Sequence, residues 1–555
     1  MKKVIPLILL LLFSCFDKKI KEDEVIKRET PVFVSEPEFS GQKYLDNFLL
    51  NHKDDSLWFE HVKNFYKARN YRLAWSDSGI FIPQTGIFIN AIYNLDQEGF
   101  DLNCFEETDI WELYSAASTS EGKPAPQYVK LREDIDILLT LTFFKYARQI
   151  WQGASSPEVN KWHIKKKEVD YIASLNAVLA GKDSLNPLIS QNPLHQEYHY
   201  LKKALYHYKE IQKSGGWGEI ILPEGIEAIQ KGDSFLIIRE FKKRLYITGD
   251  FSSEVENSDF DSDLEKAVKQ FQFRHGLDST GIVNKKTVSE MNIPVESRIR
   301  QIAVNMERWR WLPAKGGAKY IAINIPNYML HAFENNKHAW QMKAIVGKSA
   351  TNTPVFNSEI SHVVFNPSWT APKSIAVNEI LPAIKKNPDY LVNHEMEVFR
   401  GGKKISSDSI NWAKVTEENF NFTFRQKPGP KNPLGNVKFL FPNNYDVYLH
   451  GTPAQTLFTR EERGFSHGCI RLESPIKFAE YVLMYNKEIT IDKINKILSD
   501  GEEKYVRVKN KLPVYIVYLT CWEDSKGLLH FRKDIYGHDK ALEKALENLK
   551  FKTVN

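Results

Sequence analysis

The chain has 555 residues, of which 42% are hydrophobic and 26% charged, and its 75 basic and 70 acidic side chains leave a net charge of +5. This length exceeds the roughly 100–200 residues of one domain, so several units are expected. The hydrophobic content excludes wholesale disorder, and so mild a charge excludes a dedicated nucleic-acid binder.

The N-terminus has the features of an export signal. Lys2 and Lys3 precede an apolar run over 4–13, which is too short for a spanning helix of about 20 apolar residues. The run ends in Leu12-Phe-Ser-Cys15, which resembles the lipobox of bacterial lipoproteins. The resemblance implies a signal peptide over 1–14, lipidation of Cys15 and a periplasmic lipoprotein anchored to a membrane of the cell envelope. An ordinary secretory signal is the alternative.

The next segments are expected to be a charged tether over 15–40 and a helical scaffold domain over 41–225. Residues 135–148 are apolar on most faces, as in a helix buried in a bundle. Glu133, Asp134 and Asp136 could be catalytic carboxylates, but we interpret them as a solvated helix N-terminus, where acidic side chains are favoured.

Residues 226–294 are expected to form a small unit of three helices. Ile238, Phe241 and Leu245 have helical spacing before Gly249, and a second set repeats it before Gly276. The stretch resembles the three-helix peptidoglycan-binding domain. A three-helix spacer that binds nothing is the alternative, because such residues specify a fold more firmly than a binding groove.

A β-rich domain is predicted over 295–545, followed by a tail over 546–555. Short apolar or alternating runs separated by turn residues indicate its strands. They begin at Tyr320, Met329, His338, His362, Val437 and Tyr445. A partly helical insertion over 370–432 interrupts the pattern and is too long for an ordinary loop, so a capping role is expected. Residues 513–520 and 528–532 are predicted to form a final hairpin that completes the sheet. The fold class is therefore multidomain α+β.

One cysteine stands in a position suited to catalysis. The chain has four, Cys15, Cys104, Cys469 and Cys521, with no Cys-x-x-Cys pair, so neither a disulfide framework nor a thiolate zinc site is expected. Cys469 follows Ser466-His-Gly in a turn, where a substrate can reach it. A thiol needs a base to act as a nucleophile, and His450, at the end of a predicted strand, is a candidate. Pairing with its imidazole is expected to lower the pKa of the Cys469 thiol well below neutral.

The two segments together resemble the signature of the L,D-transpeptidase catalytic domain. They read His450-Gly-Thr and Ser466-His-Gly-Cys-Ile-Arg. Further agreement comes from Phe365-Asn-Pro-Ser-Trp, Pro428-Gly-Pro-Lys-Asn-Pro-Leu-Gly, Tyr448-Leu-His and Tyr515-Ile-Val-Tyr-Leu-Thr-Cys-Trp. The resemblance is closest to the large periplasmic members, which have a helical scaffold, a peptidoglycan-binding domain and a capped catalytic domain.

The resemblance implies a role for each residue of the signature. Cys469 would be the nucleophile and His450 the general base, oriented by the Gly451 carbonyl. Main-chain N–H groups of His467, Gly468 and Cys469 would form the oxyanion hole. The implied substrate-binding residues are Tyr448, Trp369 and Arg471, for which packing roles are equally compatible with the sequence. No metal or cofactor is implied.

The implied reaction is acyl transfer between peptidoglycan stem peptides, one the donor and another the acceptor. A Cys469 thioester would form with release of D-alanine, and a neighbouring stem amine would resolve it as a 3–3 cross-link. Carbapenems are the expected inhibitors, and no nucleic acid is expected as a partner. The sequence leaves open an L,D-carboxypeptidase that uses water, a non-catalytic wall-binding lipoprotein, and a zinc site of His450, His467 and Cys469.

Overall fold

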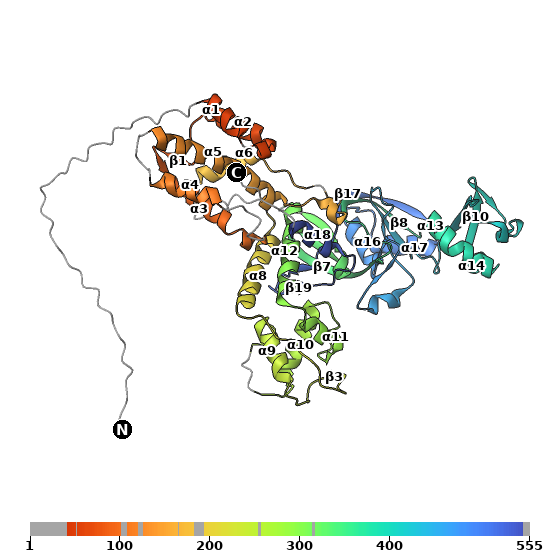
Figure 1. The fold of residues 1–555 in the computed structure, drawn as a ribbon. Helices are drawn as coiled ribbons and strands as arrows, with labels where there is room; N and C mark the ends of the chain where they lie inside the picture. The colour runs from red at the N-terminus through yellow and green to blue at the C-terminus, as the bar shows by residue number, and fades with distance from the viewer. Residues whose placement is uncertain are drawn as a thin grey trace, which may run out of the picture.

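The structure is a computed structural model that describes residues 41–51, 53–100, 108–119, 126–164, 166–181, 194–252, 257–313 and 317–547. The predicted signal peptide, the tether with Cys15, and Cys104 lie outside these residues. Figure 1 shows a helical part, a small three-helix unit, a β-rich domain and a subdomain that projects from the far side of that domain.

The N-terminal part of the described chain is mainly helical. Its helices are α1 (Gln42–Leu50), α2 (Phe59–Ala68), α3 (Pro83–Tyr93), α4 (Thr108–Ser118), α5 (Pro126–Gln152), α6 (Tyr171–Ala180) and α8 (Gln196–Lys213), and β1 (Ser76–Asp77) pairs with β2 (Ile80–Phe81). The long helix α5 supplies Ile137, Leu141 and Phe143 to a shared core, all with no exposed surface. The predicted buried helix over 135–148 is thus confirmed.

The acidic residues of α5 do not lie at its N-terminus. The helix begins at Pro126, well before Asp136, whose side chain is fully buried. The Asp136 carboxylate accepts hydrogen bonds from the amides of Ala74 (2.9 Å) and Trp75 (2.7 Å) and from the Tyr66 hydroxyl (2.6 Å). Our interpretation of a solvated helix start is therefore wrong for Asp136: it anchors the segment after α2, as a buried charge with several donors can. Burial raises its pKa to about 6.

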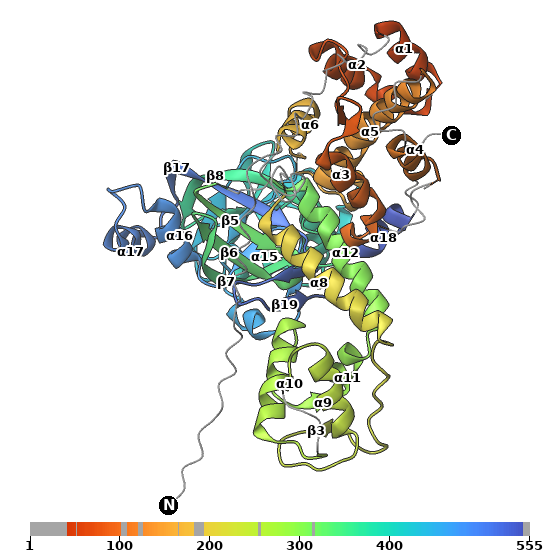
Figure 2. The same ribbon diagram turned by 90° about the vertical axis from the view of Figure 1, so that its left-hand side faces the viewer.

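The three-helix unit consists of α9 (Ile238–Ile247), α10 (Ser262–Arg274) and α11 (Lys285–Met291), with a two-stranded ribbon of β3 (Ala228–Ile229) and β4 (Val283–Asn284). It lies below the β-rich domain in Figures 1 and 2. Asp261 caps α10 by accepting the amide of Leu264 (2.8 Å), the usual task of an aspartate at this position. Phe241 and Leu245 are fully buried in a core of its own, as their spacing predicts.

Helix α12 (Val295–Trp311) joins the helical part to the β-rich domain. Figure 2 shows it beside α8, and its residues enter the cores of both parts. Its three buried arginines are paired: Arg298 with Glu290, Arg308 with Asp539 (2.6 Å) and Arg310 with Glu307 (2.9 Å). Because a buried charge that loses its partner destabilises strongly, these pairs fix α12 in place.

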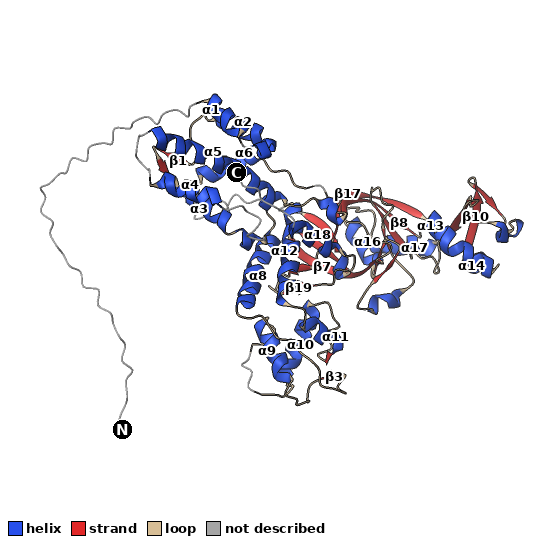
Figure 3. Ribbon diagram, in the orientation of Figure 1, coloured by secondary structure: helices blue, strands red, loops and turns tan. Residues whose placement is uncertain are grey.

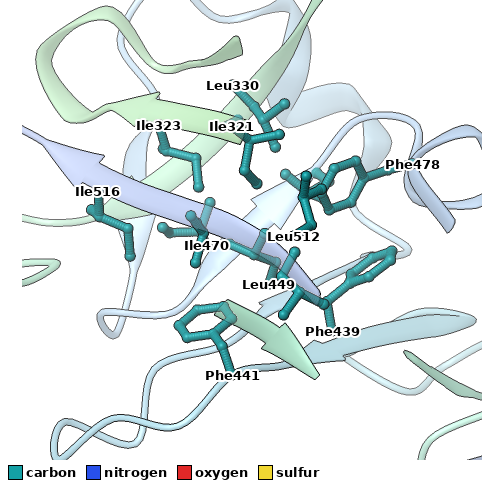
Figure 4. Packing of buried hydrophobic residues seen from close by; sticks show 14 of the residues in the cluster. Ile321, Ile323, Leu330, Phe439, Phe441, Leu449, Ile470, Phe478, Leu512 and Ile516 are labelled. Carbon is teal, nitrogen blue, oxygen red and sulfur yellow. The ribbon is translucent and has the colours of Figure 1, made fainter. Parts of the chain in front are cut away.

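The β-rich domain is built on a nine-stranded sheet. Its strands are β5 (Lys319–Asn324), β6 (Met329–Glu334), β7 (Lys337–Gly347), β8 (Phe356–Phe365), β13 (Val437–Leu440), β14 (Leu449–His450), β15 (Gly464–Ser466), β16 (Ile470–Leu472) and β17 (Lys504–Val517). They lie in the order β15-β7-β16-β14-β13-β8-β17-β5-β6, and β6 also pairs with β7. Helices α16 (Pro475–Leu483) and α17 (Ile491–Asp500) lie between β16 and β17 in the sequence, and α18 (His538–Glu547) follows β17. Figure 4 shows the core, in which Phe478 of α16 packs against Phe439 (ring centroids 4.7 Å). None of the helices in the described ranges is long and apolar enough to cross a bilayer.

The predicted final hairpin is wrong in its pairing. Residues 513–517 belong to β17, which runs between β8 and β5, so both of its edges are already occupied. The chain then turns away, and β18 (Cys521–Glu523) pairs with β19 (Leu529–Phe531) as a separate ribbon. This ribbon contacts the three-helix unit, where the Arg532 guanidinium donates to the Arg274 carbonyl (2.9 Å).

The insertion forms a subdomain with its own sheet and core. It contains β9 (Trp369–Thr370), α13 (Lys373–Ile375), a π-helical turn (Ala376–Ile380), α14 (Leu381–Lys386), α15 (Tyr390–Asn393), β10 (Met396–Arg400), β11 (Lys403–Ile405) and β12 (Phe422–Gln426). The strands lie in the order β11-β10-β12-β9, and Figure 3 shows them apart from the main sheet. Phe424 and Ile384 lie in its separate core. We call it the capping subdomain.

Candidate active site

Side-chain alternation along three neighbouring strands gathers the candidate residues on one face of the main sheet. Phe439, Leu449 and Ile470 point into the core and are fully buried (Figure 4). Their neighbours in the sequence therefore point to the other face, because successive side chains of a strand alternate. These neighbours are Lys438, Tyr448, His450, Cys469 and Arg471.

The strand register places His450 between two cations. Lys438 of β13 pairs with His450 of β14, and His450 pairs with Arg471 of β16. Leu449 pairs with Ile470, so Tyr448 and Cys469, one residue earlier on each of these parallel strands, come next to each other. The predicted base thus lies on β14 and the predicted nucleophile immediately before β16, one residue apart in register.

The strand that carries His450 is shorter than predicted. Only Leu449 and His450 are extended strand, whereas we expected the strand to begin at Tyr445. The side-chain oxygen of Asn443 accepts hydrogen bonds from the amides of Tyr445 (3.0 Å) and Val447 (3.1 Å), which holds this segment in a turn.

His450 is a buried, neutral imidazole. Its Nδ1 lies 2.5 Å from the Gly451 carbonyl, which can only accept, so Nδ1 carries the proton and the lone pair of the neutral ring is on Nε2. Burial, followed by the charges of Arg471 and Lys438, lowers the pKa of His450 to about 3. An imidazole in this state can accept a proton. The orienting role expected for the Gly451 carbonyl agrees with this geometry.

Cys469 is partly buried and protonated at rest. Its Sγ lies 3.6 Å from the Asp446 carbonyl, and no hydrogen bond joins it to His450 within the described chain. Burial raises the pKa of the Cys469 thiol above its ordinary value, although Tyr448, Lys438 and Arg471 act in the opposite direction. The expectation that a histidine lowers this pKa well below neutral is therefore wrong for the resting protein, because removal from water outweighs the nearby charges.

Lys438 is a member of the site that sequence reasoning missed. Its Nζ lies 3.8 Å from the centre of the Tyr448 ring, a cation–π contact, and the Tyr448 and His450 rings are 5.6 Å apart. Burial lowers the pKa of Lys438, and the neighbouring Cys469 raises it. A lysine between the buried Val437 and Phe439 was the available signal.

The loop before Cys469 has a conformation that requires glycine. Gly468 has φ +116°, which side-chain-bearing residues rarely adopt. Its amide donates to the Ser466 hydroxyl (3.1 Å), and that hydroxyl donates to the Cys469 carbonyl (2.5 Å). Of the three amides expected to form an oxyanion hole, Gly468 is thus already engaged. Those of His467 and Cys469 donate to no acceptor in the described part of the chain.

The remaining predicted residues lie around this loop and in the capping subdomain. The His467 ring is not buried, and its Nε2 lies 2.7 Å from Oε1 of Glu379 in the π-helical turn of the capping subdomain. Arg471 has a buried Nε without a hydrogen-bond partner. Trp369 lies at the root of the capping subdomain, where it packs against that subdomain's core.

No group of three or more His, Cys, Asp or Glu side chains in the described ranges is arranged to hold a metal ion. His467 contacts Glu379, whereas His450 is held by the Gly451 carbonyl, so the two imidazoles are bound in different surroundings.

Comparison with protein families identifies three segments of the chain. Residues 318–515 match the L,D-transpeptidase catalytic domain, and this range contains every member of the site described above. The chain therefore contains a segment similar to the L,D-transpeptidase catalytic domain. Residues 60–205 match the family described as "Scaffold domain", and residues 237–291 the one described as "Putative peptidoglycan binding domain". The family resemblance and the α+β fold class are confirmed.

A curated relative supports the same family. It is a protein of Haemophilus influenzae named "Putative L,D-transpeptidase", 30% identical over 310 residues. The match covers 54% of this chain and 62% of that protein, less than two thirds of the relative's length.

The solved structures found are distant. A chain of the L,D-transpeptidase from Xylanimonas cellulosilytica is 12% identical, with a TM-score of 0.17, and the match covers 53% of this chain and 100% of that one. An L,D-transpeptidase structure from Stackebrandtia nassauensis is 12% identical, with a TM-score of 0.21 and coverages of 52% and 94%. At such TM-scores the likeness adds nothing to the family assignment.

Proposed function

We propose that the protein is a cysteine-dependent L,D-transpeptidase that forms 3–3 cross-links between peptidoglycan stems. The observation that carries this proposal is the placement of Cys469 on the same sheet face as a neutral, carbonyl-oriented His450, one residue away in register and beside two amides without acceptors in the described chain. Nucleophile, base and oxyanion donors are the parts that acyl transfer requires.

In the first half-reaction, Nε2 of His450 takes the Cys469 proton as Sγ attacks the carbonyl of the third residue of a donor tetrapeptide stem. The carbon–sulfur bond forms, and the carbonyl oxygen becomes an oxyanion near the loop amides. The amide carbon–nitrogen bond then breaks, the proton passes from His450 to the leaving nitrogen, and D-alanine departs. A thioester remains on Cys469.

In the second half-reaction, a side-chain amine of a neighbouring stem attacks the thioester. The new carbon–nitrogen bond replaces the carbon–sulfur bond, and a proton from the amine returns the thiol to its resting form through His450. No ATP is consumed, because one amide replaces another. With water in place of the amine, the same steps give a carboxypeptidase.

We assign substrate contacts to the surroundings of the thiol. Arg471, with its unpartnered Nε, suits a carboxylate of the donor stem, and Tyr448 forms a wall beside Cys469. The capping subdomain meets the nucleophile loop through Glu379 and His467, which supports a lid over the donor site that moves during turnover. Trp369, at its root, would line the same pocket.

The proposal extends to location. The lipobox-like segment ending at Cys15 supports a periplasmic lipoprotein held at a membrane of the cell envelope, with the tether over 15–40 allowing the enzyme to reach away from the membrane. The three-helix unit would hold the enzyme on peptidoglycan, consistent with the family that residues 237–291 match.

Incubation of the purified protein with tetrapeptide muropeptides, followed by mass analysis, tests the proposal. Dimers that have lost one D-alanine and are cross-linked between third residues are the expected product, absent with Cys469→Ala. Tripeptide monomers alone would identify a carboxypeptidase, and an unchanged substrate would leave only the non-catalytic alternative.

A further inference from the structure

The loop that follows β7 contacts the nucleophile loop at two consecutive sites. Gly347 ends β7, and residues 348–353 lead on towards β8. The Ser466 carbonyl accepts hydrogen bonds from the Lys348 amide (3.0 Å) and the Thr351 hydroxyl (3.0 Å). The Gly468 carbonyl accepts one from the Thr353 hydroxyl (2.8 Å).

These contacts determine the direction of two amides. In a trans peptide unit, the carbonyl of one residue and the N–H of the next point in opposite directions, and the unit is rigid. The Ser466 carbonyl shares its peptide unit with the His467 N–H, and the Gly468 carbonyl shares one with the Cys469 N–H. Both carbonyls face the loop of residues 348–353, so both N–H groups point away from it.

The amide between them is directed elsewhere. The Gly468 N–H donates to the Ser466 hydroxyl, which is itself buried and held by the Cys469 carbonyl. Two amides therefore remain for an oxyanion, and each is oriented by a threonine hydroxyl on its carbonyl side.

Thr353 is itself held rigidly. It is 1% exposed, and its hydroxyl accepts the Gly347 amide (2.9 Å) while it donates to Gly468. The Tyr536 hydroxyl accepts the Thr353 amide (3.3 Å) and donates to the Gly347 carbonyl (2.6 Å). Tyr536 lies beyond the segment that matches the catalytic domain, residues 318–515.

We propose that Thr353 and Thr351 are positioning residues that orient the Cys469 and His467 amides as a two-donor oxyanion hole, with Tyr536 holding Thr353 in place. This inference rests on the proposed function, because it requires attack on a carbonyl. On this inference the Gly468 amide does not donate a hydrogen bond to the oxyanion.

Two reactions of the same thiol separate orientation of the amides from folding. Acylation by meropenem develops an oxyanion, whereas alkylation by iodoacetamide displaces iodide and develops none. Both are followed by mass spectrometry of the intact protein. Loss of a complete oxyanion donor slows catalysis by about 10²–10³-fold. Thr353→Val, which keeps the shape and removes the hydroxyl, is expected to slow acylation about tenfold or more and leave alkylation within about twofold of wild type.

The conservative variant and the double variant complete the test. Thr353→Ser keeps the hydroxyl and should restore acylation, whereas Thr351→Val combined with Thr353→Val should slow it further. Equal slowing of acylation and alkylation, or unchanged acylation in Thr353→Val, would overturn the inference. If the wild-type protein is alkylated at Cys469 but neither acylated by meropenem nor active on muropeptides, the proposed function itself fails.

Discussion

Substitution of Gly435 tests whether His450, the proposed general base, depends on a close contact between two backbone segments. Its φ is +60°, and a Cβ placed there would lie 2.7 Å from the Thr452 nitrogen and 2.8 Å from the Gly451 carbonyl carbon. Ordinary contact begins at 3.4 Å, so Gly435→Ala must move one backbone against the other by about 0.7 Å. The Gly451 carbonyl that moves is the one that holds Nδ1 of His450 at 2.5 Å.

The expected effect of Gly435→Ala has two components. A left-handed conformation costs an alanine about 1–2 kcal/mol. Since misplacement by 1 Å can cost about 10²-fold in rate, a shift of this size should slow meropenem acylation by about tenfold to a hundredfold. Gly249→Ala is the matched control, because Gly249 has φ +75° with no atom within 4 Å and lies in the three-helix unit.

Thermal unfolding and acylation rates are measured for both variants. The two should lose similar stability from backbone strain, with any additional loss in Gly435→Ala coming from the clash, and only Gly435→Ala should lose acylation. If Gly435→Ala remains folded and is acylated at the wild-type rate, then His450 does not need its carbonyl partner, and our account of the base is incorrect.

Other predictions concern the thiol, the capping subdomain and the anchor. Because burial raises the pKa of Cys469, the rate of iodoacetamide alkylation should rise with pH, with a midpoint above the ordinary thiol value of about 8.5. Lys438→Met removes a cation and should move that midpoint higher. A rate that stays constant down to acidic pH would instead indicate a resting thiolate–imidazolium pair. Glu379→Gln, which weakens the contact with His467, should change the rate of muropeptide cross-linking by about twofold to fivefold. The unfolding temperature should stay within about a degree or two of wild type, since exposed ion pairs contribute about 0.2–1 kcal/mol. Identical cross-linking kinetics would show that this contact does not control a lid. Cys15→Ala should release the protein from membranes after salt washing, and equal retention would refute the lipid anchor.

The sequence predicted that Cys469 and His450 lie near each other, because both stand in a pattern of specific residues. The fold places His450 on β14 and Cys469 immediately before the neighbouring β16. Helix and core positions such as Phe241 and Leu245 follow from spacing alone, because a helix must bury one face.

The errors have a common physical cause, which is tertiary context that no local pattern contains. Asp136 resembles an acidic residue near a helix start, yet donors from residues 66–75 make it a buried anchor. The segment of residues 513–517 resembles half of a hairpin, but both edges of β17 are filled by strands distant in the sequence. The thiol pKa depends on burial, which spacing between Cys469 and His450 does not report.

The charges around Cys469 and His450 explain why an uncharged thiol and an uncharged imidazole at rest suit the proposed chemistry. Lys438 and Arg471 flank His450 in register, so a proton on the imidazole is disfavoured while a negative charge nearby is favoured. The thiol proton is therefore transferred most easily during attack on a bound substrate. The negative charge then develops on the carbonyl oxygen of the substrate and not on sulfur, and the same cations and the loop amides can stabilise it there. Without substrate the thiol stays protonated, and thiols react with oxidants mainly as thiolates. A thiol that is protonated at rest is therefore expected to react slowly with oxidants.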